Sequence, residues 1–168
     1  MDKINWIYQL HPSLCSSISG YDTMRERFEN CLLNGRIVPM MPDWDYILLE
    51  LSEADRDLAA SQRADAHHDC KWAIITAYSS MYHSYRSLIM VKGYQEKSES
   101  CLRDALDALY VEEGALDPAL LAGFREAKHL YNQALYDGVY SEPSSKWILE
   151  SAKAIREAVR GLIPVDPF

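Results

Sequence analysis

Arg125 and His129 have the residue types and the spacing that phosphate chemistry requires. They are four positions apart in a segment with helical periodicity, so both side chains should lie on one helical face. There the histidine could exchange a proton while the arginine stabilises the negative charge of a transition state, without a metal. The plainer interpretation is a solvated helix face, because Glu126 and Lys128 flank the pair.

His83 and Arg86 form a second pair, three positions apart, in the most apolar segment of the chain. Polar groups on such a helix must either be satisfied by buried partners or face a groove. The pair is therefore a candidate binding site. The alternative is a core histidine beside an arginine that is paired with a carboxylate.

Lys97 and Ser98 stand where another helix should begin, and free backbone N–H groups at a helix start favour a phosphate. Glu99 in the first turn opposes an anion, so Ser98 is better interpreted as a helix cap. Arg63 and His68, with four residues between them, are a further candidate for the same arginine–histidine chemistry, but they fall in a predicted loop.

Metal and cofactor chemistry has little support in the sequence. His67 and His68, followed by Asp69 and Cys70, are adjacent residues that would not face one ion from a helix, so we expect no metal site and no cofactor. The four cysteines lack a C-x-x-C pair. We therefore expect reduced, structural thiols.

Long segments with apolar residues at intervals of three and four predict an all-α protein. We expect a helix from Asp22 as its N-cap to about Leu33, and then helices starting near 43, 69, 98, 117 and 141, with Asp43 and Asp117 as caps. Short connections between these helices predict an up-and-down bundle of four or five helices with an N-terminal helical extension. The expected division is residues 1–42 for the extension and its linker, 43–163 for the bundle and 164–168 for a tail.

Composition sets the broad class of the protein. The 168 residues are 48% hydrophobic and carry a net charge of -8, which suits a globular domain and disfavours a general nucleic-acid coat. The first 42 residues hold four basic and four acidic side chains, so the acidic excess lies in the rest of the chain. No apolar run is long enough for a membrane span or a secretory signal, which predicts a cytoplasmic protein.

Two stretches carry a resemblance to a known family. They are MYHSYRSL, from Met81 to Leu88, and GYQEKS, from Gly93 to Ser98; a third, ALYDGVY from Ala134 to Tyr140, follows later. In order and spacing these stretches resemble the HEPN family of prokaryotic helical domains, over roughly residues 28–162. The chain departs from the family pattern at Glu99, where histidine is common, and at Leu135, where aspartate is common.

The resemblance implies an interaction module, often encoded beside a minimal nucleotidyltransferase in a toxin–antitoxin or stress-response pair and able to contact nucleotide or RNA. It also implies a defined role for His83 and Arg86. RNA-cleaving members use Arg and His with four to six residues between them, whereas Arg125 and His129 have three. A metal-independent ribonuclease toxin therefore stays the alternative, beside a purely structural dimerisation domain.

Self-association is the last expectation. The central helix is apolar on two faces, and a small bundle has more aromatic side chains than it should need to bury. HEPN-like domains are also generally dimeric, so we expect a homodimer. The aromatics that support this expectation are Trp44, Trp72, Tyr78, Tyr82, Tyr85, Tyr131 and Trp147.

Overall fold

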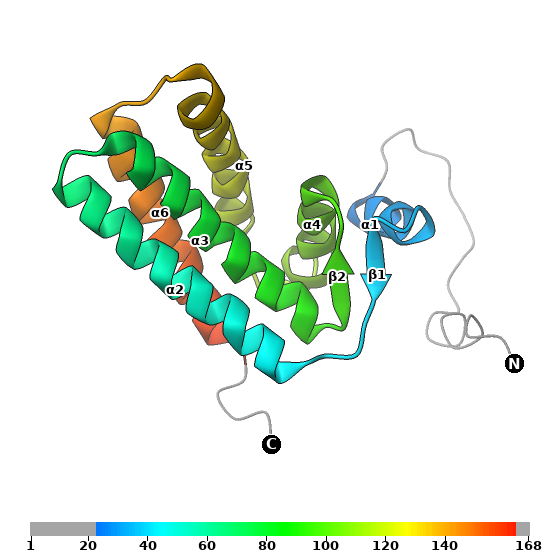
Figure 1. Cartoon of the computed structure of the whole chain (residues 1–168). Helices are drawn as coiled ribbons and strands as arrows, with labels where there is room; N and C mark the ends of the chain where they lie inside the picture. The colour runs from blue at the N-terminus through cyan, green and yellow to red at the C-terminus, as the bar shows by residue number, and fades with distance from the viewer. Residues whose placement is uncertain (1–22, 164–168) are drawn as a thin grey trace, which may run out of the picture.

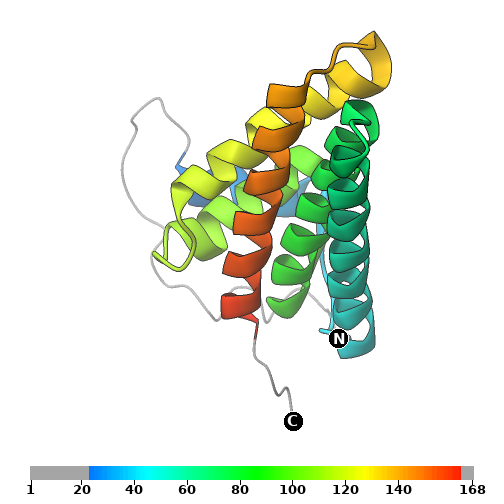
Figure 2. The same ribbon diagram turned by 90° about the vertical axis from the view of Figure 1, so that its left-hand side faces the viewer.

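The computed structural model describes residues 23–163 and shows an all-α fold. Figure 1 shows α2, α3 and α6 side by side, with α1, α4 and a small sheet gathered at the end of α3 and the start of α2. In Figure 2, α5 crosses α6 at an angle. The helices are α1 Met24–Leu33, α2 Trp44–Ala66, α3 Cys70–Val91, α4 Glu99–Leu106, α5 Pro118–Asn132 and α6 Glu142–Leu162.

Capping residues explain most helix starts. Asp43, Asp69 and Asp117 accept backbone hydrogen bonds at the starts of α2, α3 and α5, which confirms the predicted caps at Asp43 and Asp117 and the predicted helix start near Asp69. The prediction of Asp22 as the first cap was wrong. Thr23 caps α1 instead, and Glu26 completes a capping box with it.

The start of α4 differs from the prediction in one detail. Ser98 stands at the cap position but makes no capping hydrogen bond; its hydroxyl lies 2.9 Å from that of Ser100. The helix then widens into a π-helical turn, Asp107–Val111, and α5 similarly continues as a π-helical turn, Gln133–Asp137.

Helices α2 and α3 approach closely because small side chains lie between them. The Ser61 hydroxyl donates to the backbone carbonyl of Ala73 at 2.8 Å, and the Ser80 hydroxyl donates to that of Ala54 at 2.7 Å. Both serines are fully buried, so these bonds satisfy groups that would otherwise be costly to bury. They fix α3 against α2 along much of its length.

A salt bridge joins α6 to α2. The buried Arg156 guanidinium donates two hydrogen bonds to the Asp55 carboxylate, at 2.7 and 2.9 Å, and Arg160 adds a third at 3.0 Å. The hydrogen bond from Arg156 is the main cause that holds the pKa of Asp55 below its ordinary value, against the opposing effect of burial. This ion pair fixes the orientation of α6.

A two-stranded antiparallel sheet, which the sequence analysis did not predict, joins the N-terminal region to the bundle. Strand β1, Ile37–Pro39, pairs with β2, Tyr94–Glu96, so that Ile37 lies opposite Glu96. Helix α1 packs against α4 beside this sheet (Figure 1). The division of the chain at residue 42 stays a prediction.

Helix α3 is the central helix, as its apolar pattern predicts. Most of its side chains are buried, and Tyr78 and Tyr85 among them are enclosed by the chain's own helices. These two tyrosines therefore do not supply the exposed aromatic surface on which the expectation of a homodimer was based. Among residues 23–163, no helix combines the length and the apolar character that crossing a membrane requires.

Candidate functional site

A polar groove of about 310 Å³ opens between α3, the start of α4 and α5. We call it the tyrosine groove. Helix α3 contributes four of its lining residues, α4 contributes one and α5 contributes two, so its shape depends on three helices packing together. The lining residues are Tyr78, Ser79, Tyr82, His83, Glu99, Lys128 and Tyr131.

Aromatic stacking positions the floor of the tyrosine groove. The Tyr78 ring stacks on Phe124 with 5.3 Å between centroids, and it lies 4.6 Å from the Tyr131 ring. Tyr78 and Phe124 are buried, so α3 and α5 meet through a continuous apolar contact below the opening. Tyr82 and Tyr131 are only half-buried and line the part that solvent reaches.

The Tyr78 hydroxyl is a polar atom without a hydrogen-bond partner among the described residues, although its side chain is 95% buried. Burial, with Glu99 nearby as a second cause, raises the pKa of Tyr78 far above its ordinary value. The phenol is therefore neutral at every physiological pH. The Glu99 carboxylate is the acceptor nearest in effect to this buried hydroxyl, since its hydrogen bonding and charge both add to the raised pKa.

Lys128 is the cation of the tyrosine groove. Its ammonium lies 5.0 Å from the centroids of both Tyr78 and Tyr131, and 2.7 Å from the Glu99 carboxylate. The two rings and the carboxylate hold the ammonium in place on one side of the opening. Glu99, which was considered at the sequence level only as an obstacle to a phosphate, is thus the ion-pair partner of Lys128.

His83 lies between two carboxylates of α2. Its Nδ1 is 2.7 Å from Glu50 Oε2, and its Nε2 is 3.8 Å from Asp57 Oδ2. The hydrogen bond with Glu50 is the main cause that raises the pKa of His83, against the opposing effect of burial. His83 is accordingly poised to carry a proton at the edge of the groove.

Arg86 is held in a buried ionic network rather than aimed into the groove. Its guanidinium lies 2.9 Å from Glu50 and 2.7 Å from Glu96, and the Tyr82 hydroxyl donates to the same Glu96 oxygen at 3.0 Å. Glu50 and Glu96 are both buried, so each depends on Arg86 for charge compensation. The two residues of this candidate pair therefore differ: His83 lines the groove, and Arg86 positions the carboxylates around it.

Arg125 and His129 lie together on an exposed face of α5, as their spacing predicts. Neither lines the tyrosine groove. Arg125 lies near the carboxylate of Asp107. Burial raises the pKa of Asp107, and the positive charges of Arg27 and Arg125 oppose that effect. The pair is thus open to solvent, with one carboxylate close to its arginine.

The remaining candidates from the sequence also lie outside the tyrosine groove. Lys97 is exposed, and its backbone N–H donates to the Arg36 carbonyl at 2.7 Å. Arg63 is exposed in the last turn of α2 and not in a loop as predicted, whereas His68 is exposed in the turn before α3 and has a positive φ of 58°. Neither set is brought together with His83.

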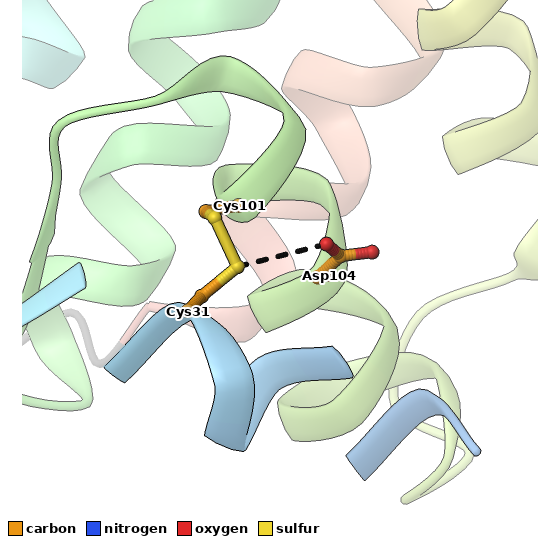
Figure 3. A group of neighbouring side chains, drawn as sticks. All are labelled: Cys31, Cys101 and Asp104. Atoms are coloured by element: carbon orange, nitrogen blue, oxygen red, sulfur yellow. Dashed lines mark hydrogen bonds between the residues drawn. A yellow bond between two sulfur atoms is a disulfide. The ribbon is translucent and has the colours of Figure 1, made fainter. Parts of the chain in front are cut away.

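The expectation of reduced cysteines was wrong for two of them. Cys31 of α1 and Cys101 of α4 form a disulfide across a sequence separation of 70 residues. Asp104 lies beside it, with a carboxylate oxygen 3.7 Å from Cys31 Sγ (Figure 3). Cys70 is free, and Cys15 lies outside the described residues.

A second, apolar hollow of about 580 Å³ lies between α5 and α6. Leu120 and Gly123 line it from α5, and Trp147, which is 41% exposed, lines it from α6. Its other lining residues include Lys146 and Glu150 at adjoining turns of α6. This hollow offers contact area but few groups that could do chemistry.

Sequence reasoning missed Lys128 and Glu99 as parts of one site, because their contact joins α5 to α4. At the sequence level Tyr78 and Tyr82 of α3 supported only the expectation of self-association, because helical spacing could not show which residues of α5 face them.

Comparison with known proteins adds one finding. The family model described as HEPN domain matches residues 49–162, which is most of the chain and includes every residue that lines the tyrosine groove. A search of curated proteins found no match.

Proposed function

The chain belongs to the HEPN family, and on that premise we propose that it is an interaction module whose tyrosine groove contacts a nucleotide or a short single-stranded RNA. The observation that carries the proposal is the combination of half-buried tyrosine rings with the Lys128 ammonium in one groove. Every base has a π-face that can stack on an aromatic ring, and a lysine is a common partner of a phosphate.

Each group of the groove has a role in this proposal. Tyr131 and Tyr82 provide the stacking surface, and the buried Tyr78 ring supports them from the side of Phe124. Protonated His83, whose pKa is raised by Glu50, donates a hydrogen bond from its Nε2–H to a phosphate oxygen, while Nδ1 stays bound to Glu50.

The charge of the groove restricts the ligand. Lys128 is already paired with Glu99, so a phosphate must share this ammonium with a carboxylate. The chain as a whole carries a net charge of -8. We therefore infer that the groove takes a base with few phosphates and that binding depends only weakly on salt, unlike binding to a long phosphate backbone.

Fluorescence anisotropy with a fluorescein-labelled single-stranded RNA tetramer tests the proposal. We expect Tyr131→Ala to weaken binding by about 1–3 kcal/mol, because it removes a stacking ring, while Tyr131→Phe keeps the ring and the affinity. Unlabelled AMP should compete with the labelled RNA. Equal binding by the alanine variant, or no binding by the native protein, contradicts the proposal.

For the biological setting we propose a paired system, as the family resemblance implies. The module would act with a nucleotidyltransferase as one half of a toxin–antitoxin or stress-response pair in the cytoplasm. An adjacent nucleotidyltransferase gene and co-purification of the two proteins would support this part of the proposal.

We also propose that the module forms a homodimer. The apolar α5–α6 hollow, with the exposed Trp147 at its side, supports this proposal. Burial of an aromatic side chain against such a surface favours association. Light scattering at micromolar concentration should give a mass of twice 19.2 kDa, and Trp147→Ala should lower it.

The second candidate function is a metal-independent ribonuclease that uses Arg125 and His129. The observation that favours it is their joint exposure on one face of α5, where RNA has unhindered access. Its test is RNA cleavage without added metal, compared between the native protein and His129→Ala.

A further inference from the structure

We propose that Cys31 and Cys101 form a redox-modification site whose disulfide latches the N-terminal α1–β1 unit onto the wall of the tyrosine groove. The effect on ligand affinity rests on the proposed function of the groove, whereas the effect on the wall itself does not. The latch goes beyond the HEPN match, because Cys31 lies before residue 49, where the match begins.

The disulfide joins two regions that are otherwise distant in sequence. Cys31 lies in the last turn of α1, and Cys101 lies in the first turn of α4, 70 residues later. Both sulfur-bearing side chains are buried, with exposures of 6% and 1%. Figure 3 shows the bond crossing between the two helices, with Asp104 of α4 beside it.

The segment that the disulfide holds also forms a wall of the tyrosine groove. Glu99, two positions before Cys101, lines the groove and pairs with Lys128. Strand β2 lies just before Glu99 and carries Glu96, which accepts a hydrogen bond from the Tyr82 hydroxyl and pairs with Arg86. Strand β2 also pairs with β1, which follows α1 after a short turn, so α1 is linked to this wall both through the sheet and through the disulfide.

Noncovalent contacts also hold α1, and they decide what reduction would do. Arg27 pairs with Asp104 and Asp107, and the Phe28 ring packs edge-on against Tyr94 of β2 at 5.2 Å. None of these contacts includes a cysteine sulfur, so reduction does not remove them directly. Reduction should loosen α1, β2 and the start of α4 without unfolding the bundle, because the partly exposed ion pairs of Arg27 restrain α1 less than the covalent bond does.

The reduction is a thiol–disulfide exchange with a dithiol. One thiolate of the dithiol attacks a sulfur of the Cys31–Cys101 bond, which breaks as a mixed disulfide forms; the second dithiol thiol then resolves it. Two electrons pass from the dithiol to the protein, the dithiol becomes a cyclic disulfide, and its two protons are delivered to the cysteine sulfurs. The Cys31 thiol that results can donate its hydrogen to Asp104.

Burial gives the latch its selectivity. Because both cysteines are buried, a dithiol reaches the sulfurs only when α1 moves away from α4. The rate of thiol–disulfide exchange therefore depends on how often α1 and α4 separate, and reduction in turn makes that separation more frequent. Disulfides of proteins in a reducing compartment are usually redox-sensing or catalytic rather than permanent. In a cytoplasmic setting the oxidised form would therefore mark oxidative conditions.

Hydrogen exchange of the full-length protein tests the latch directly. In the native protein, dithiothreitol should accelerate amide exchange in 94–106 by about tenfold or more. The double variant Cys31→Ser/Cys101→Ser should exchange at the reduced rate with or without dithiothreitol. Cys70→Ser, which removes the free cysteine of α3, should respond like the native protein. Equal exchange in oxidised and reduced native protein overturns the proposal.

A binding measurement separates the latch from the function of the groove. The oxidised protein should bind the labelled RNA tetramer at least about fivefold more tightly than the reduced protein, because its wall is preorganised. If no RNA binds in either state but exchange still responds to reduction, the proposed function fails and the latch stands. If RNA binds with one affinity in both states, the regulatory part of the latch fails.

A third measurement distinguishes a disulfide latch from a metal site. The ligand atoms of Cys31, Cys101 and Asp104 all lie within 4.8 Å of one another, and thiolates are preferred zinc ligands. Zn²⁺ added to the reduced protein should leave exchange in 94–106 fast. Slow exchange restored by Zn²⁺ would overturn the redox latch in favour of a metal-held one.

Discussion

Two pairs of a histidine and an arginine, one on α3 and one on α5, can be compared, because the two members of each pair are about one helical turn apart. The first pair is surrounded by carboxylates, and the second is exposed to solvent. His83 and Arg86 of α3 lie among the carboxylates of Glu50, Asp57 and Glu96 at the edge of the tyrosine groove. Arg125 and His129 of α5 are exposed. Both pairs have a spacing that places their side chains on one helical face.

The comparison shows that spacing selects candidates while surroundings decide their chemistry. Carboxylates compensate the positive charge of the α3 pair and hold both side chains in one geometry. This arrangement suits ligand binding and a protonated His83, but it restricts the movement of the two side chains. The α5 pair can reach a large substrate, but few neighbours orient it. Three predictions test this contrast, in order of decreasing expected effect.

Removal of Glu50 should produce the largest change. Glu50→Ala takes away the carboxylate that both His83 and Arg86 contact, and leaves a partly buried guanidinium with only Glu96. We expect the free energy of unfolding to fall by about 3 kcal/mol, as is usual when one member of a buried ion pair is lost. Urea unfolding followed by circular dichroism measures this change.

The matched control is on the exposed pair. Arg125→Ala should alter the free energy of unfolding by no more than about 0.5 kcal/mol, because its side chain lies on the surface. Similar losses in Glu50→Ala and Arg125→Ala would remove the distinction between the two regions.

The second prediction concerns RNA cleavage without added metal. If cleavage occurs, His129→Ala and Arg125→Ala should each lower kcat by about 100-fold or more, since each removes a transition-state interaction. Arg63→Ala and His68→Ala serve as controls at the α2–α3 turn. Cleavage that survives the α5 substitutions but disappears in His83→Gln would place the chemistry in the tyrosine groove.

The third and smallest effect is the dependence of stability on pH. The hydrogen bond with Glu50 raises the folded-state pKa of His83 above its ordinary value of about 6.5. The stability that His83 contributes is therefore fully present below about pH 6.5 and is lost as the pH rises through the folded pKa. His83→Gln and Glu50→Gln should each flatten this part of the profile of unfolding free energy against pH.

Comparison of thermal unfolding between pH 6 and pH 9 detects the difference. An unchanged slope in both variants would mean that other groups dominate. Asp57, whose pKa burial raises, also faces His83 and is one such group.

Local sequence signals predicted much of the fold. Asp43, Asp69 and Asp117 cap their helices because a short side-chain oxygen reaches the next backbone N–H groups, an interaction within a few residues. The apolar pattern of α3 identified it as the central helix, since a helix that is apolar nearly all round must be buried. The order of the MYHSYRSL and GYQEKS stretches identified the HEPN family, which the match over residues 49–162 confirms.

The tertiary structure decided which of these residues meet. Helical periodicity showed that His83 and Tyr82 share a region of α3, but Lys128 and Tyr131 reach them only because α5 packs across α3 through Phe124. The pairing of β1 with β2 and the bond between Cys31 and Cys101 likewise join segments that are far apart in the chain. Capping and periodicity depend on interactions between neighbouring residues, so the sequence by itself determines them; a groove, a buried ionic network and a disulfide depend on long-range packing, which no local pattern records.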